Sequence, residues 1–306
     1  MRVRLLGTAA GGGFPQWNCN CANCRAVRNG ESGLAPRSQS CVAISADGKR
    51  WFLLNASPDV RAQIESFPPL QPAHGATRGT GIEGVLITNA DLDHTLGLFI
   101  LREGGPLSIY ATPTVREALS QGLSIDSVLS SYCRLTWHAP PETLTPLRRA
   151  GGEASGLLYQ AFALPGKPPR YRERHAAPDP GDCVGYRFLD EKSGRTLLFL
   201  PDVAALNNEA HALLKECDAL LMDGTFWSDD EMARMGAGTT PASRMGHWPV
   251  GGEDGSLALL KTLPIPRKIY THINNTNPML RPGSAEHAAV QAAGCEVGVD
   301  GLEFEL

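Results

Sequence analysis

The stretch "TNADLDHTLGL" (residues 88–98) places two aspartates and a histidine between two apolar runs. The preceding "IEGVLIT" is typical of a short buried strand, and "TLGLFILREG" is typical of an apolar helix. Alternate residues of an extended segment face the same side, so Asn89, Asp91 and Asp93 can converge, and His94 follows at the helix start. Acidic residues at a helix N-terminus can simply stabilise that terminus. Carboxylates beside an imidazole also suit a cation such as Fe, Mn or Zn.

Three further strand ends carry residues that can bind a metal. Asp202 follows the apolar run "LLFL", Asp223 ends "DALLMD", and His272 follows "RKIYT". A single aspartate after a strand is often a turn residue, and a single histidine in that place is usually structural. We expect the four strand ends to meet at one edge of the fold, and their joint occurrence favours a metal site over helix capping.

The cysteines are unevenly distributed. "NCNCANC" contains Cys19, Cys21 and Cys24, whereas the other five of the eight cysteines are scattered along the chain. A disulfide framework is typical of smaller secreted proteins, so we interpret the triplet as metal ligands. Three thiolates need one further ligand to complete a tetrahedral, structural zinc site.

The composition limits the class of protein. The chain has 306 residues, of which 42% are hydrophobic and 20% charged, as in soluble globular proteins. A formal net charge of −4 without a long basic run gives no electrostatic case for binding nucleic acid. There is no apolar run of the roughly 20 residues that span a bilayer, and the first apolar stretch is too short for a secretory leader. We therefore expect a cytoplasmic protein that does not bind membranes.

The order of elements predicts a single α/β domain over residues 1–306, with two β-sheets packed together and helices outside. Hairpins are predicted around the turns "ADGK" and "EKSG", and a final strand pair is predicted in "CEVGVDGLEFEL". The segment 165–182, rich in proline and charge, is predicted to be a surface loop or lid. Neither an internal repeat nor a low-complexity linker divides the chain.

These motifs together resemble a known superfamily. The pattern N-x-D-x-D-H, an Asp after a later strand and a final "TH" resemble the metallo-β-lactamase superfamily, which uses H-x-H-x-D-H, a bridging Asp and a final His. The segments "GTAAGGGFPQWNCNCANC", "LLNASPDVRAQI", "MDGTFWSDDEM", "MGHWPVGGEDGSL" and "THINNTNP" resemble the coenzyme PQQ synthesis protein B (PqqB) family over nearly the whole chain. The resemblance implies an αβ/βα sandwich of two mixed β-sheets with helices on the outer faces.

The chain departs from the superfamily pattern at two positions. Asn89 and Asp91 stand where the hydrolases have histidines, and an Asn amide is a weak neutral ligand. We therefore expect one metal ion, and two histidines with carboxylates are close to the ligand set of non-haem Fe(II) oxygenases. The residues expected to be catalytic and to bind this Fe²⁺ are Asp91, Asp93, His94, Asp202 and His272.

The resemblance also suggests residues around this site. Those expected to contact substrate are Asn89, Asp223, His247 and Asn274, although turn chemistry is the alternative for such stretches. His175 is a further candidate ligand, and His247 is either a pocket residue or a cap for the next helix. In phosphodiesterase relatives the fourth zinc ligand lies three residues after the final His, which is Asn275 here.

The resemblance implies a role in pyrroloquinoline quinone (PQQ) biosynthesis: metal- and O₂-dependent hydroxylation of the tyrosine ring of a Glu-Tyr-derived precursor. The partners would be a small peptide or amino-acid-like precursor and O₂, and a homodimer is compatible with the sequence. One alternative is a metal-dependent hydrolase of the phosphodiesterase type, which a second occupied metal site would favour. The other is a carrier for transport of PQQ or its precursor.

Overall fold

The computed structural model describes residues 1–306, except for the solvent exposure of Gly104. The first sheet contains, in spatial order, β14 (Glu303–Glu305), β1 (Arg2–Gly7), β2 (Cys41–Ser45), β3 (Trp51–Leu54), β4 (Ile82–Leu86), β5 (Leu107–Tyr110) and β6 (Leu135–His138). The second contains β13 (Glu296–Val297), β12 (Arg267–Thr271), β11 (Ala219–Asp223), β10 (Thr196–Leu200), β9 (Val184–Asp190), β8 (Ala154–Ala163) and β7 (Thr145–Arg148).

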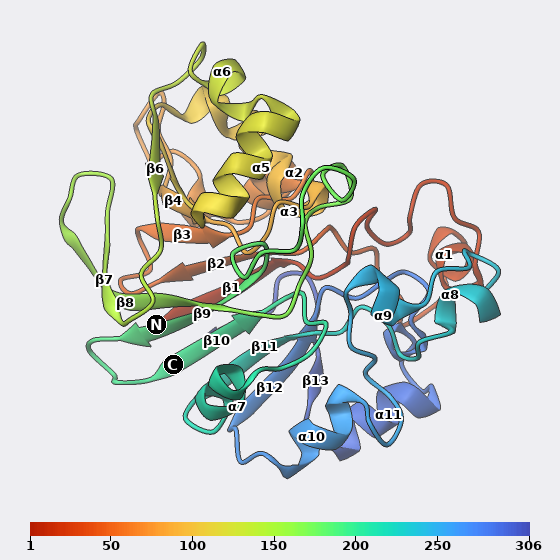
Figure 1. Ribbon diagram of the computed structural model, residues 1–306. Coiled ribbons are helices and arrows are strands. Elements are labelled where there is room, and N and C mark those ends of the chain that lie inside the picture. The colour runs from red at the N-terminus through yellow and green to blue at the C-terminus, as the bar shows by residue number, and fades with distance from the viewer.

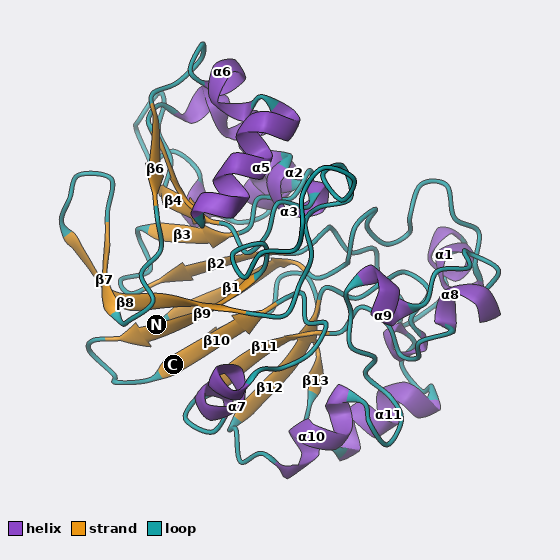
Figure 2. Cartoon of the chain, in the orientation of Figure 1, coloured by secondary structure: helices purple, strands orange, loops and turns teal.

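The helices cover the outer faces of the two sheets, except for α1, α8 and α9, which lie to the right of the strands in this view (Figures 1 and 2). They are α1 (Ala22–Arg28), α2 (Val60–Glu65), α3 (Leu92–Thr95), α4 (Gly97–Ile100), α5 (Pro113–Leu123), α6 (Ile125–Leu129), α7 (Asn208–Leu214), α8 (Glu231–Arg234), α9 (Ala242–Met245), α10 (Ser256–Thr262) and α11 (Ala285–Ala292), with 3-10 turns η1 (Pro68–Leu70), η2 (Leu101–Gly104) and η3 (Pro278–Leu280). The expected sandwich of two mixed sheets is confirmed. Each described helix is too short or too polar to cross a bilayer.

The apolar core lies in three layers. Phe52 and Phe199 are buried between the two sheets, Leu119 of α5 packs over the first sheet, and Val290 of α11 packs over the second. Every residue of β2, β3, β10 and β11 is buried. A strand that is covered on both faces has apolar residues in succession, which explains why polar and apolar residues do not alternate in "TLLFL" of β10.

The two predicted hairpins are present, but the predicted final strand pair is wrong. β2 pairs with β3 and β9 with β10, all antiparallel. β13 instead pairs with β12 in the second sheet, and β14 pairs with β1 in the first. The intervening residues cross between the sheets, where Asp300 accepts hydrogen bonds from Thr8 and Ser38. The chain therefore closes one edge of each sheet with its last two strands.

The strand directions bring the predicted metal-binding residues to one edge. β10, β11 and β12 run parallel to one another, as do β3, β4 and β5. The carboxyl ends of parallel strands lie at the same edge of a sheet, which is where α/β proteins place their ligands. Asp93 lies in the first turn of α3, the short helix that follows β4, and the loops after β10 and β12 carry Asp202 and His272.

Residues 165–182 form neither helix nor strand, as predicted. The Tyr171 hydroxyl donates to the Ala90 carbonyl (2.9 Å), and Thr112 Oγ1 donates to the Gly181 carbonyl (2.6 Å). The loop is therefore anchored at two points beside the strand ends.

Candidate metal centres

Two groups of ligand atoms meet at the strand ends. In one group, atoms of Asp93, His94 and His272 all lie within 4.8 Å of one another, and in the other, atoms of Asp202, His247 and His272 do. His272 Nε2 is 3.2 Å from Asp93 Oδ2, and His94 Nε2 is 3.8 Å from the same oxygen. Four of the five predicted active-site ligands, together with His247, are thus brought together.

His94 has a buried ring nitrogen that nothing satisfies. Its Nδ1 lies 3.0 Å from Asn55 Nδ2 and 3.2 Å from Thr88 Oγ1. Its Nε2 is buried and has no hydrogen-bond partner among the described residues. A buried polar atom without a partner costs about 1–3 kcal/mol. A cation beside Asp93 would remove that cost, and so the donor set fits a metal ion.

His272 is held in a strained backbone conformation, with φ of 55°. Such strain persists only where the surroundings impose it, and it is common at functional sites. The Thr225 hydroxyl lies 2.8 Å from Nδ1, which leaves Nε2 directed at Asp93. Burial disfavours the charged imidazole, but the carboxylates of Asp202, Asp93 and Asp223 raise the pKa of His272 to about 10. The acidic cluster therefore requires a positive charge, which a bound cation would also supply.

Asn89 is hydrogen-bonded to the acidic cluster. Its Nδ2 donates to Asp202 Oδ2 (2.9 Å), and its Oδ1 accepts from the Asp91 backbone N–H (3.0 Å). Asp91 belongs to neither close group of ligand atoms among the described residues. Burial, with Asp93 and Asp202 adding repulsion, raises the pKa of the Asp91 carboxyl to about 7. The two residues that depart from the superfamily pattern are therefore an amide hydrogen-bonded to Asp202 and a carboxyl in the cavity wall.

The predicted substrate contact of Asp223 is not what the structure shows. Its side chain is 1% exposed and does not line the cavity. It accepts from the Val203 N–H (2.9 Å) and contacts His247 Nδ1 (2.8 Å), because the last residue of β11 turns its side chain inward. Asp223 thus holds His247 in the cavity lining. His247 does not cap α10, because the N-cap of that helix is Gly255. The Asp223 carboxylate outweighs burial and raises the pKa of His247.

A cavity of about 610 Å³ opens over these groups. It is lined by Ala10, Gly11, Asp91, Asp93, Lys167, Arg170, Glu173, Asp202, Thr225, Phe226, Thr240, Arg244, Met245, His247, His272 and Asn274. Asn274 lines this cavity, and its contact with a substrate stays a prediction. His175 is exposed on the 165–182 loop and lies outside the cavity lining, so it is not placed as a ligand.

The three predicted thiol ligands converge at the start of α1. Ligand atoms of Cys19, Cys21 and Cys24 lie within 4.8 Å of one another. The side-chain amide of Asn275 faces all three, with Nδ2 at 3.1 Å from Cys19 Sγ and 3.3 Å from Cys24 Sγ. Burial, with the neighbouring thiols adding repulsion, raises the pKa of Cys24 to about 12. Three clustered thiols fit a zinc site, because a cation would stabilise the Cys24 thiolate that burial opposes. Asn275 is not placed as the predicted fourth ligand, since its Nδ2 faces the sulfurs as a hydrogen-bond donor.

Sequence reasoning missed the residues that orient the histidines. Asn55, Thr88 and Thr225 contact the far sides of the two imidazoles. The sequence does place Asn55 directly after the apolar run of β3. Asn is enriched among residues with a left-handed backbone, and Asn55 adopts φ of 63°.

Known proteins resemble this chain over its full length. Residues 50–273 match the beta-lactamase superfamily domain. The chain is 41% identical to the coenzyme PQQ synthesis protein B of Methylococcus capsulatus, covering 100% of both chains, and 43% identical to that of Cupriavidus taiwanensis, covering 99% of both. The crystal structure of Zn²⁺-bound PqqB from Methylobacterium extorquens matches with a TM-score of 0.90 and 41% identity, covering 100% of both chains. This chain therefore belongs to the coenzyme PQQ synthesis protein B family of the beta-lactamase superfamily.

Proposed function

We propose that the protein acts in PQQ biosynthesis as a metal-dependent hydroxylase of the tyrosine ring in a Glu-Tyr-derived precursor. The supporting observation is the placement of Asn89, whose amide is hydrogen-bonded to Asp202 where the superfamily has a metal-binding histidine. The remaining donors, two histidines with carboxylates, suit a single Fe²⁺ with open positions. A one-metal site of this composition favours oxygen chemistry over hydrolysis by a two-metal centre.

The residues present have distinct parts in this proposal. Asp93, His94 and His272, which form one close group, would hold the metal, which when bound supplies the activation of O₂. Asp202, the further predicted ligand, belongs to the adjoining group that shares His272. Phe226 and Met245 line the same cavity and offer apolar surface to an aromatic ring. His247 uses Nδ1 to contact Asp223, which leaves Nε2 free to hold or transfer a proton in the cavity.

To test this proposal, the protein is loaded anaerobically with Fe(II). O₂, ascorbate as the reductant and a Glu-Tyr dipeptide are then added. Mass spectrometry should detect a product that has gained one oxygen atom on the tyrosine ring. Zinc-loaded protein should give none, and His94→Ala and His272→Ala should each abolish the product because each removes a metal-binding nitrogen. Equal turnover of a phosphodiester by the zinc-loaded protein would contradict the proposal.

A metal-dependent hydrolase is the second candidate. The observation that favours it is the second group of ligand atoms, from Asp202, His247 and His272, which could hold a further ion. Two metals in this pocket together with phosphodiester hydrolysis would support it. A carrier of PQQ or its precursor would instead bind the dipeptide without turning it over under any metal loading.

A further inference from the structure

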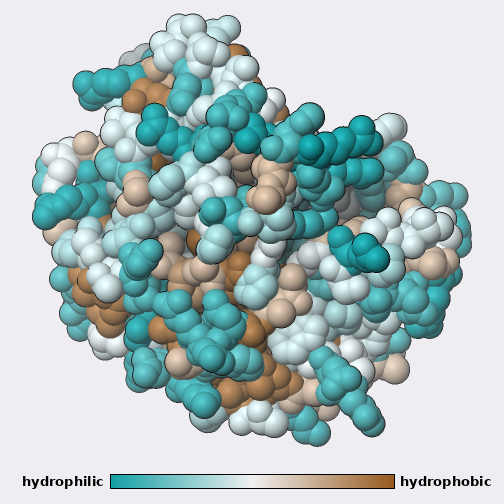
Figure 3. All heavy atoms as spheres, in the orientation of Figure 1, coloured by the Kyte–Doolittle hydropathy of each residue, from teal (hydrophilic) through white to brown (hydrophobic). Residues whose placement is uncertain are grey.

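Two arginines at the mouth of the cavity have guanidinium groups without a partner among the described residues. Arg170 lies on the 165–182 loop and Arg244 on α9, and both are exposed residues of the cavity lining. Among the described residues, neither guanidinium forms an ion pair or a side-chain hydrogen bond; the backbone carbonyl of Arg244 does accept a bond from Lys167. Figure 3 shows strongly hydrophilic groups over both segments. Guanidinium groups bind carboxylates through paired N–H donors, so these two are available to a ligand.

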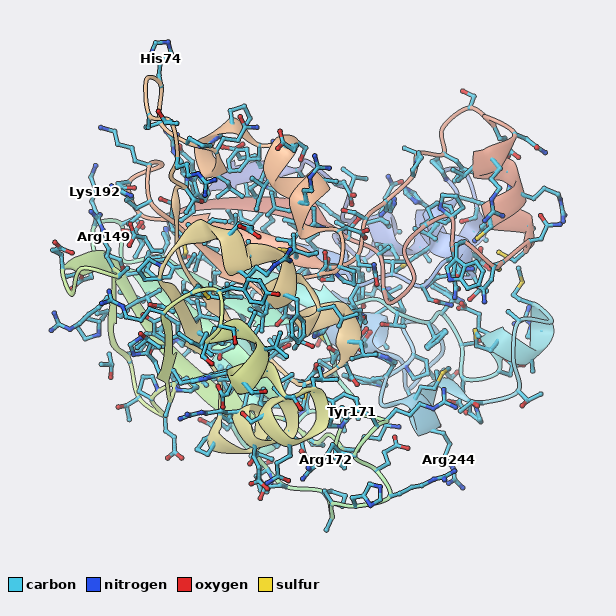
Figure 4. All side chains as sticks on the ribbon, turned by 90° about the horizontal axis from the view of Figure 1, so that it is seen from above. His74, Arg149, Tyr171, Arg172, Lys192 and Arg244 are labelled. Carbon is cyan, nitrogen blue, oxygen red and sulfur yellow. The ribbon has the colours of Figure 1, made fainter. Side chains whose placement is uncertain are left out.

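The other charged side chains of the loop that lie next to Arg170 in the cavity lining or in sequence have partners. Lys167 Nζ contacts Glu173 Oε1 at 2.6 Å. Arg172 donates to Gln121 Oε1 (2.6 Å) and so fastens the loop to α5. Tyr171, the residue after Arg170, is tied to the Ala90 carbonyl beside the metal-binding loop. Figure 4 shows Tyr171, Arg172 and Arg244 along the same edge of the molecule. Arg170 is thus held at the mouth by an anchored segment.

The floor of the cavity carries the opposite charge. Asp91, Asp93 and Asp202 line it, and their negative charge disfavours the approach of a substrate carboxylate. The uncharged ring of a substrate can approach the floor, whereas its carboxylates are attracted to the mouth. The separation of charge between floor and mouth therefore fixes one orientation of an elongated acidic ligand.

We propose that Arg170 and Arg244 form a carboxylate-recognition rim that selects an amino-acid-like substrate with at least two carboxylates and orients its neutral ring toward the metal. The proposal deepens the function proposed above and rests on it for the identity of the ring. Lys167, paired with Glu173, positions the rim by donating to the Arg244 carbonyl (3.2 Å).

Calorimetry on the metal-loaded protein tests the rim without turnover. The probes are the Glu-Tyr dipeptide and Gln-Tyr amide, an analogue that keeps the α-ammonium group and lacks both carboxylates. Arg170→Gln and Arg244→Gln should each weaken binding of the dipeptide about tenfold, the effect of losing a charged hydrogen bond of roughly 1.5 kcal/mol, and leave the analogue unchanged. Arg174→Gln is the matched control, since Arg174 is exposed on the same loop but does not line the cavity.

The outcomes separate the rim from the reaction. Loss of dipeptide affinity confined to the two rim variants supports the rim even if no hydroxylated product forms. Unchanged affinity in both variants, or equal loss for the carboxylate-free analogue, overturns it even if hydroxylation proceeds. Tighter binding of inorganic pyrophosphate than of the dipeptide, lost in the same variants, would also overturn it, because the rim would then be a phosphate site.

Discussion

At the scale of single residues, the proposed one-metal site rests on Asn89. Its amide donates to Asp202 and offers no strong ligand. We predict that Asn89→His combined with Asp91→His raises the content of this pocket from one metal toward two, because imidazoles then stand at both positions where the superfamily has them. Anomalous scattering at the metal edges measures the occupancy, and Asp91→His alone serves as the control. Two metals already present in the unaltered pocket would contradict the prediction.

The sequence predicted the convergence of Asp93, His94, Asp202 and His272 because all four follow strands whose carboxyl ends meet at one edge. It did not predict how each imidazole is oriented. Asn55 lies 39 residues before His94, and contacts across such separations leave no periodic pattern in the sequence. Asp223 was misjudged for a related reason: a strand-end carboxylate can face the cavity or the core, and the periodicity of a fully buried strand does not distinguish the two.

At the scale of elements, α1 and the preceding loop depend on the thiol cluster. α1 has seven residues, and Cys21 is its N-cap, so the helix begins inside the cluster. Helices this short are unstable alone, and a metal supplies ordering free energy. We predict that Cys21→Ser loses one equivalent of zinc and lowers the melting temperature, while the Asp/His site still loads iron. Cys133→Ser is the control, since Cys133 is equally half-buried but isolated. An unchanged zinc content in Cys21→Ser would refute a structural zinc here.

Elements with strong local signals were predicted, and those set by distant pairing were not. Both hairpins were predicted from their turns, "ADGK" and "EKSG". β7 and β8 were missed because Pro146 and Gly156 interrupt their runs, and such residues weaken the signal of a strand. The partners of β13 and β14 were not predicted because they depend on which edge strand of each sheet is unpaired. The topology of the whole chain decides which strands lie at the edges.

At the scale of the whole molecule, Glu231 links the pH of the solution to stability. Its side chain is buried and accepts hydrogen bonds from Thr276 and from the Trp227 N–H. Burial outweighs those bonds and raises the pKa of the carboxyl from 4.5 to about 7. Below pH 4.5 both folded and unfolded chains keep the proton, so there is no penalty. Between 4.5 and 7 only the unfolded chain releases it, so the free energy of unfolding falls as pH rises.

We therefore predict that the fall amounts to roughly 3 kcal/mol, at 1.36 kcal/mol for each unit of pKa, and ends near pH 7. In E231Q the side chain stays neutral, so the free energy of unfolding should lack this fall. The variant should be less stable than the native chain near pH 5, where it loses one hydrogen-bond acceptor, and should be the more stable of the two by pH 8.

Urea unfolding across this range, with the zinc content verified at each pH, measures the difference. Glu209→Gln, an exposed change on α7, should leave the native profile unaltered. Parallel pH profiles for E231Q and the native chain would show that Glu231 ionises alike in both states, because only a pKa that differs between them can tie stability to pH.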